Sequence, residues 1–371
     1  MLHLRPIRAT EGAEAPPAPS LGPGAARWWK LWRLDPEARL SLLPYLEERG
    51  MSPRAVGDDA LLFYSDTDTI LTLAEREPFR GREATLRRAA RGLRREERTR
   101  FSPELGGAAI MGVLNVTPDS FSDGGEFFSF DRAVERGVRL AAEGADLIDV
   151  GGESTRPGAA GVSPKEEIRR VVPVIRELRD AVKTPISVDT RKAAVARVAV
   201  RAGATVLNDV SGLHHEPDLA RVAAESGADL VLNHIRGTPE NMQENPRYDD
   251  VVAEVYDDLA RSAEIAVASG VAEDKIVIDP GIGFGKRLED NLALLRHLGE
   301  FRSLGFPILV GPSRKSFIGI LLGLPVEERL EATLGACVAA VRNGADILRV
   351  HDVRAVIHAV RTAEAIEREG E

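Results

Sequence analysis

The chain has 371 residues, a net charge of −9 and a single cysteine. This length allows one large domain and a smaller one, because a single α/β barrel needs about 250 residues. The acidic balance argues against general nucleic-acid binding, which favours a basic domain. A hydrophobic content of 43% with 29% charged residues is typical of a soluble globular protein.

Two features of the chain predict a cytoplasmic protein that neither crosses nor enters a membrane. The single cysteine, Cys337, lies in an apolar helical run, so we expect it to be a buried packing residue that forms no disulfide within the chain. Residues 1–14 contain no apolar stretch of signal-peptide length, and no run of about 18 apolar residues follows.

The first hundred residues are expected to form an extension or a small α+β domain of unknown role. Residues 13–24 are rich in Pro, Ala and Gly and predict a flexible lead. All three tryptophans follow at positions 28, 29 and 32, and then come a helical pattern over 38–49 with a predicted break at Pro44, an apolar run over 61–64 and a solvated arginine-rich helix over 82–98.

From Gly107 onward, short apolar runs that end in polar residues alternate with helical patterns. Eight strands are predicted, over residues 110–114, 147–150, 186–188, 206–207, 230–232, 276–278, 308–310 and 347–350. A Gly-Ala-Asp phrase precedes three of these strands, at 144–146, 227–229 and 344–346, and glycine commonly terminates helices. Eight repeats of strand and helix predict a (β/α)8 TIM barrel over residues 107–371.

One helix of this barrel carries clear start signals and one anomaly. The segment 163–166 offers Ser163 as a cap, a proline in the first turn and Glu166 at the capping-box position. Pro173 interrupts the apolar periodicity that follows, and the sequence does not explain it.

Polar residues follow nearly every predicted strand, which predicts a catalytic face where the strands end. They fall into three chemical sets. Asp189, Asn208, Asp279 and Lys315 suit the edge of a flat, nitrogen-rich heterocycle. Arg156, Arg349 and His351 are cationic donors for an anion such as diphosphate, and Asn115 offers a hard oxygen for Mg²⁺.

The glycine-rich segment 279–286 is not a nucleotide motif. Its spacing differs from that of a P-loop, and Arg287 stands where Ser or Thr is required. The glycines are expected to let the backbone approach a flat ligand closely.

The order of the motifs resembles that of the dihydropteroate synthase family. The segments that carry the resemblance are MGVLNVTPDSFSDGG at 111–125, GGESTRPG at 151–158, SVDT at 187–190, NDV at 208–210, DPGIGFGK at 279–286, SRKS at 313–316 and RVH at 349–351. The resemblance covers about residues 107–371. It departs from the family pattern around His234, where Asn233 and Ile235 stand at positions that are often Met, and His234 itself has a structural and a functional interpretation.

The resemblance implies an enzyme that joins 6-hydroxymethyl-7,8-dihydropterin diphosphate to p-aminobenzoate by a dissociative displacement, and it suggests a homodimer. It assigns the pterin to Asp189, Asn208, Asp279 and Lys315, Mg²⁺ to Asn115, and the diphosphate to Arg156, Arg349 and His351. The p-aminobenzoate pocket is assigned to Thr155, Pro157, Phe284, Lys315 and Ser316. Asp119, in the loop of the first motif, is either a partner for the cation or for loop closure, or a turn-forming residue after a proline.

Two other functions remain open from the sequence. A pterin-binding methyltransferase domain that serves a corrinoid protein would share the barrel and the pterin set, but it needs no diphosphate cluster. A non-catalytic paralogue would use the barrel as a scaffold, but the presence of both the pterin set and the diphosphate set argues against this function.

Overall fold

The computed structural model describes residues 3–7, 27–32, 36–48, 50–51, 53–56, 60–65, 107–117, 125–156, 158–159 and 161–368. The chain divides into two compact units, one of Met1–Glu97 with Gly299–Phe306 and one of Arg98–Leu298 with Pro307–Glu371. The segments 13–24 and 82–98 lie outside the described residues. Among the described residues, no helix has both the length and the apolar character that a membrane span requires.

Among its described residues, the first unit contains a four-stranded antiparallel sheet in the order β1-β2-β4-β3 and the helix α1, together with the segment 299–306. Its elements are β1 (His3–Ile7), β2 (Arg27–Trp32), α1 (Pro36–Glu47), β3 (Arg54–Val56) and β4 (Ala60–Ser65). Trp29 of β2 and Leu46 of α1 are fully buried. The predicted break at Pro44 is wrong: α1 continues through it, and Pro44 is exposed, so the carbonyl that loses its helical partner can bond water.

The second unit is a nearly closed barrel of parallel strands, which confirms the predicted barrel. The strands are β5 (Ala109–Asn115), β6 (Leu147–Gly151), β7 (Ile186–Asp189), β8 (Val206–Asp209), β9 (Asp229–Asn233), β10 (Ile276–Asp279), β11 (Leu309–Val310) and β12 (Ile347–Val350). They are hydrogen-bonded in the order β10-β9-β8-β7-β6-β5-β12-β11. A parallel bridge between Ile278 and Ile308 joins the two ends of this order.

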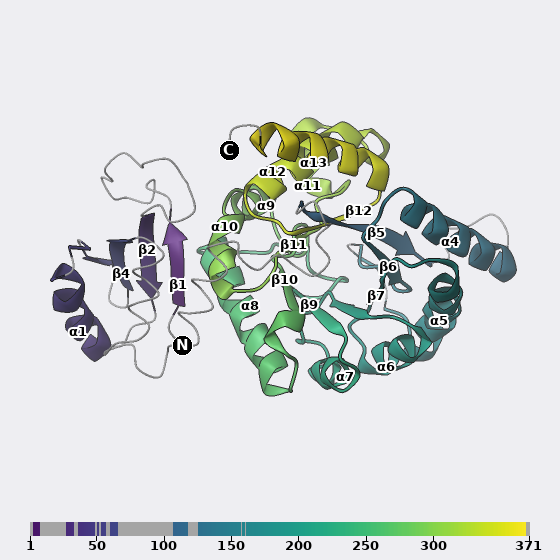
Figure 1. Cartoon of the computed structure of the whole chain (residues 1–371), viewed down its shortest axis with the longest axis horizontal. Helices are drawn as coiled ribbons and strands as arrows, with labels where there is room; N and C mark the ends of the chain where they lie inside the picture. Colours follow the sequence, from purple (N-terminus) through teal and green to yellow (C-terminus); the bar gives the residue numbers. More distant parts are fainter. Residues whose placement is uncertain are drawn as a thin grey trace. The chain divides into compact units, whose positions relative to one another are not determined.

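Helices surround these strands on the outside (Figure 1). They are α4 (Gly125–Ala142), α5 (Pro164–Ala181), α6 (Ala193–Ala202), α7 (Asp218–Ser226), α8 (Val251–Ala268), α9 (Leu288–Arg296), α10 (Leu298–Phe301), α11 (Ser316–Leu322), α12 (Leu330–Arg342) and α13 (Val353–Arg368). The described residues also form short 3-10 helices, η2 (Glu273–Lys275), η3 (Arg302–Leu304) and η4 (Val326–Glu328).

Helix α5 forms half of the expected capping box. Ser163 Oγ accepts a hydrogen bond from the Glu166 backbone N at 3.2 Å, as predicted. The Glu166 carboxylate instead forms ion pairs with Arg169 and Arg170. Pro173 lies inside α5 on its exposed side, where water can replace the lost backbone bond.

The repeated Gly-Ala-Asp phrase is a joint that ends a helix and fastens the next strand. Gly144 and Gly344 have φ values of 99° and 117°, which residues with a Cβ rarely adopt. The aspartate two residues later accepts a backbone hydrogen bond from a neighbouring strand segment: Asp146 from Ile110 N at 2.8 Å, and Asp346 from Ile308 N at 2.9 Å.

The interior of the barrel changes from apolar to polar along the strands. A buried apolar cluster fills the interior and includes Leu147, Val206, Val231, Val277 and Ile347. Side chains on a strand share a face at every second residue. The residues two positions further on are Asp149, Asn208, Asn233, Asp279 and Arg349. The strand pattern therefore places a polar layer directly above the apolar core, at the carboxyl ends of the strands.

Candidate active site

Four strand ends bring the first candidates into one row. Asn115 pairs in register with Gly151, Gly151 with Asp189, and Asp189 with Asn208. Gly151 keeps this row open, because a Cβ built on it would lie 3.7 Å from both Asn115 Oδ1 and Asp189 Oδ2. Two oxygen-bearing side chains therefore flank a gap in the row.

Arg349 connects this row to a buried carboxylate inside β6. Its Nε donates to Asp149 Oδ2 at 2.6 Å, and its Nη2 donates to Asp189 Oδ2 at 2.7 Å. Asn208 Nδ2 donates to the same Asp149 oxygen at 2.9 Å. Asp149 is fully buried and was not among the residues predicted from the sequence. The signal available in the sequence was a carboxylate inside an otherwise apolar strand.

Burial and the neighbouring charges have opposite effects on the pKa values of this cluster. Burial raises the pKa of Asp189 to about 7, while the Arg349 guanidinium opposes the shift. Burial also disfavours the charged form of Arg349, but Asp149 and Asp189 outweigh it and raise the pKa of the guanidinium. Arg349 therefore stays cationic, whereas Asp189 loses its charge more easily than an exposed aspartate does.

Asp279 and Lys315 form a second polar group. Asp279 Oδ1 accepts a hydrogen bond from Gly281 N at 2.7 Å, so one carboxylate oxygen caps the following loop. Lys315 Nζ donates to the Ile282 carbonyl and lies 4.3 Å from the centre of the Phe284 ring. Burial lowers the pKa of Lys315 to about 8 and raises that of Asp279, and each charge opposes the shift of the other.

His351 differs from the sequence expectation of a cation. Its Nδ1 lies 3.0 Å from Ser313 Oγ, which also accepts a bond from the His351 backbone N at 3.2 Å. Burial and the nearby Arg349 guanidinium lower the pKa of His351 to about 4. In the ligand-free protein at neutral pH, His351 is therefore a neutral, oriented imidazole.

The loop after β6 is tied down by a buried ion cluster. Lys192 Nζ bonds Glu153 at 2.6 Å and Glu167 at 2.5 Å. Glu153 also accepts from Arg191 at 3.1 Å and from the Val162 backbone N at 3.3 Å. This loop carries Thr155, which is half-buried, and Arg156, which is exposed, whereas Ser316 is exposed at the start of α11. Pro157 and Asp119 lie outside the described residues.

Two polar residues at strand ends form hydrogen bonds with backbone groups of the following loops. Asp209 accepts bonds from Ser211 N at 2.8 Å and Leu213 N at 2.7 Å. Asn233 Nδ2 donates to Val210 O at 2.8 Å, which gives this departure from the family pattern a structural role.

Comparisons with known proteins fit this geometry. The family model described as "Pterin binding enzyme" matches residues 111–351. The chain belongs to the pterin-binding enzyme family. Among its relatives, the dihydropteroate synthase of Synechocystis sp. is 48% identical over 260 residues, which is 70% of this chain and 90% of that protein.

Solved structures of pterin-binding enzymes agree. The Xanthomonas albilineans dihydropteroate synthase with 4-aminobenzoic acid has a TM-score of 0.67 and 46% identity, covering 71% of this chain and 94% of that one. The same enzyme in complex with 7,8-dihydropteroate has a TM-score of 0.65 and 43% identity, covering 71% and 95%.

Proposed function

We propose that the chain is a dihydropteroate synthase, a transferase that condenses 6-hydroxymethyl-7,8-dihydropterin diphosphate with p-aminobenzoate to give 7,8-dihydropteroate and diphosphate. Relatives that share 43–48% identity carry this name or bind the matching ligands. The observation that carries the proposal is the polar layer at the barrel mouth, in which Asp279 and Lys315 interact electrostatically and Asp189 and Asn208 are held by Arg349 and Asp149.

The pterin would lie against these two polar groups. Asp279 Oδ1 already accepts a hydrogen bond from Gly281 N, so Oδ2 is the oxygen that can accept from the amino edge of the pyrimidinone. Lys315 would donate to the ring acceptors from the other side. Asp189 and Asn208 are held in place through Arg349 and Asp149, so they would meet the ligand without rearranging.

The diphosphate would lie at the outer part of the mouth. Arg156 is exposed on its loop and can reach an incoming anion. Arg349 and His351 stand two residues apart at the end of β12, and His351 would donate one hydrogen bond or gain a proton beside the anion.

Mg²⁺ is the metal that the family resemblance implies, and Asn115 would hold it. The donor set fits a Mg²⁺ ion shared with the substrate, because one side-chain oxygen suffices where phosphate oxygens and waters complete the shell. Bound there, the ion would neutralise charge on the departing diphosphate.

The chemistry follows from these positions. The bond between the pterin methylene carbon and the diphosphate oxygen breaks, and the electron pair leaves with diphosphate. The arylamine nitrogen then forms the new C–N bond and loses a proton. Arg156 and Arg349 stabilise the leaving charge, which is preorganised electrostatic catalysis and needs no side-chain nucleophile.

The p-aminobenzoate would enter beside Phe284 and Lys315. Thr155 and Ser316 stand on the loop after β6 and at the start of α11, and Pro157 is the further residue assigned to this pocket. Asp119 would take part in closing the loop after β5.

One assay separates the synthase from the two alternative functions. Diphosphate release from the pterin diphosphate is measured with and without p-aminobenzoate. We expect release that depends on p-aminobenzoate. A corrinoid-directed methyltransferase would release none, and a non-catalytic paralogue would bind pterin without turnover.

We also propose a cytoplasmic homodimer. The exposed large apolar side chains of α11 and η4 are Ile320, Leu321, Leu322 and Val326, with exposed fractions of 46–66%. Such a patch is typical of an association surface. Sedimentation should show a dimer for the parent and a monomer for Leu321→Glu; a monomeric parent would contradict the proposal.

A further inference from the structure

A buried lysine closes the glycine-rich loop after β10. Lys286 is 3% exposed. Its Nζ donates to the Phe284 carbonyl at 3.0 Å and lies 2.9 Å from His234 Nδ1 and 3.5 Å from the His234 carbonyl. The side chain therefore folds back onto its own loop and fastens that loop to the end of β9.

The loop that Lys286 closes is tightly fitted. Gly281, Gly283 and Gly285 have φ values of 71°, 83° and 62°. A Cβ on Gly281 would lie 1.8 Å from the His234 carbonyl oxygen, and one on Gly283 would lie 2.9 Å from Lys315 Cδ. Backbone here runs directly against both the His234 segment and the Lys315 side chain, so a shift of the loop must displace one of them.

The same loop supplies the contacts of Lys315. The Ile282 carbonyl accepts from Lys315 Nζ, and the Phe284 ring lies 4.3 Å from that nitrogen. Lys286 bonds the carbonyl of Phe284 itself. The positions of the Phe284 ring and of Lys315 thus depend on one loop, and the hydrogen bond from Lys286 to the Phe284 carbonyl holds that loop in its conformation.

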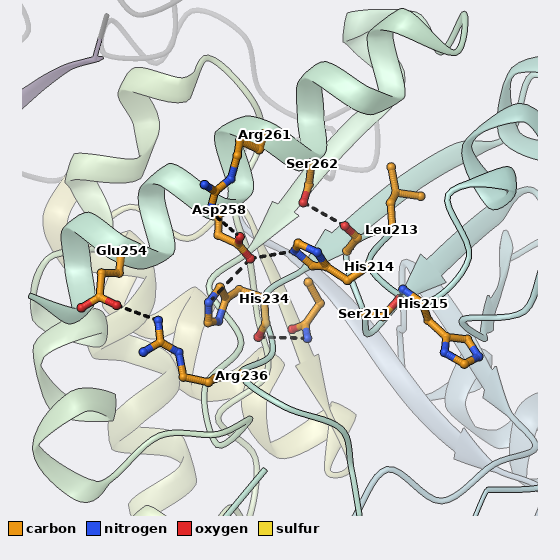
Figure 2. Close-up of polar contacts among 12 residues, drawn as sticks. Ser211, Leu213, His214, His215, His234, Arg236, Glu254, Asp258, Arg261 and Ser262 are labelled. Atoms are coloured by element: carbon orange, nitrogen blue, oxygen red, sulfur yellow. Dashed lines mark hydrogen bonds and ion pairs between the residues drawn. The ribbon is translucent and has the colours of Figure 1, made fainter. Parts of the chain in front are cut away.

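His234 is oriented from its far side by Asp258 of α8. His234 Nε2 lies 3.8 Å from Asp258 Oδ2, and Figure 2 shows that this oxygen also meets His214, at 2.9 Å. At 3.8 Å this contact is longer than a hydrogen bond, but the negative charge facing Nε2 favours the tautomer that is protonated there, with Nδ1 as the acceptor for Lys286. Arg261 binds the other Asp258 oxygen at 2.9 Å, so the carboxylate itself is fixed.

We propose that Lys286 and His234 are positioning residues that hold Phe284 and Lys315 in the geometry the arylamine requires. This inference rests on the proposed synthase function. Neither residue touches the substrates in this account: Lys286 acts through the Phe284 carbonyl, and His234 acts through Lys286.

Three variants separate this role from general packing. Lys286→Met keeps the aliphatic stem and removes the amino group. His234→Asn places an amide oxygen where Nδ1 stands, whereas His234→Gln reaches the Nε2 position and leaves Lys286 without its side-chain acceptor. His214→Gln is the matched control, because His214 meets the same Asp258 oxygen from the exposed side without touching the loop.

Steady-state kinetics should show a split between the two substrates. For Lys286→Met and His234→Gln we expect the KM for p-aminobenzoate to rise roughly 10- to 100-fold, the effect of an unmatched buried hydrogen bond. The Kd for pterin diphosphate should rise less than the KM for p-aminobenzoate, by no more than about fivefold, because Asp279 belongs to the strand and only Lys315 depends on the loop. His234→Asn and His214→Gln should resemble the parent.

Histidine-selective ¹⁵N spectra give a readout independent of turnover. The parent should show His234 protonated at Nε2 with Nδ1 as an acceptor, and Lys286→Met should change the Nδ1 signal. If Lys286→Met does not fold, the His234→Asn and His234→Gln pair decides. The proposal is overturned by an unchanged KM for p-aminobenzoate in folded variants, by equal loss of both substrates, or by His234→Asn matching His234→Gln. A parent without p-aminobenzoate-dependent turnover would instead overturn the proposed function.

Discussion

Arg349 donates to Asp149 across the barrel interior, with 2.6 Å between Arg349 Nε and Asp149 Oδ2. The carboxylate is fully buried, and the same guanidinium reaches Asp189 at 2.7 Å. Arg349 therefore neutralises buried carboxylates below the mouth, and in the proposed function it also presents positive charge to the diphosphate.

The structural duty of Arg349 can be measured by unfolding. Arg349→Ala should lower the free energy of unfolding by about 3–5 kcal/mol at pH 8, because it leaves buried carboxylates without their cation. Burial raises the pKa of Asp189 to about 7, so this carboxyl is protonated at low pH, and a protonated carboxyl needs no cation. The loss should therefore shrink as the pH falls toward 5. A loss that is constant across this range would place its origin in packing instead.

The ligand-binding duty of Arg349 needs a second pair of measurements. Arg349→Ala should weaken binding of pterin diphosphate more than binding of a pterin that lacks the diphosphate, by roughly tenfold or more, the scale of one lost charge-assisted bond. Titration calorimetry with both ligands provides the comparison. Equal losses would remove Arg349 from the diphosphate site and leave it as a clamp on Asp149 and Asp189.

Asp279→Asn tests the pterin pocket. The amide oxygen can still accept from Gly281 N, so the loop cap and the melting temperature should be nearly preserved. Its NH₂ group would face the amino edge of the pterin, donor against donor, at a cost of about 2–4 kcal/mol, or roughly 30- to 1,000-fold in affinity. If the variant instead binds pterin as well as the parent does, Asp279 is only a loop cap.

Much of this architecture is readable from the sequence, because it repeats local rules. The repeated Gly-Ala-Asp joints, with a glycine at positive φ, mark the alternation of helix and strand and so predict the barrel. The polar residues at the strand ends predict the catalytic face. The role of Asp149 could not be predicted, because a carboxylate inside an apolar strand does not show which residues face it inside the barrel. The neutral state of His351 likewise depends on burial and on Arg349, which only the fold brings near.

The pH dependence of pterin binding should follow Lys315. Burial lowers its pKa to about 8, so the ammonium is present below that value and is lost as the pH rises through it. Affinity for pterin should therefore be full near pH 7 and should fall above pH 8, and Lys315→Met should remove this alkaline decline along with most of the affinity. A decline that persists in Lys315→Met would have to come from another group.

The first unit should be dispensable for turnover. The barrel carries every assigned site residue, so a chain that begins at Arg100 should fold and keep p-aminobenzoate-dependent activity. Circular dichroism and kinetics of the truncated chain check this. A soluble, folded but inactive fragment would mean that residues 1–99 contribute to the site.

In the proposed function, this barrel mouth joins a pterin carbon to an arylamine nitrogen. The most direct measurement is a reaction of pterin diphosphate, Mg²⁺ and p-aminobenzoate that carries ¹⁵N in its amino group, followed by mass spectrometry and diphosphate analysis. We predict 7,8-dihydropteroate that retains the ¹⁵N label, with one diphosphate released per product. Unchanged labelled p-aminobenzoate after diphosphate release, or no release at all, would contradict the account.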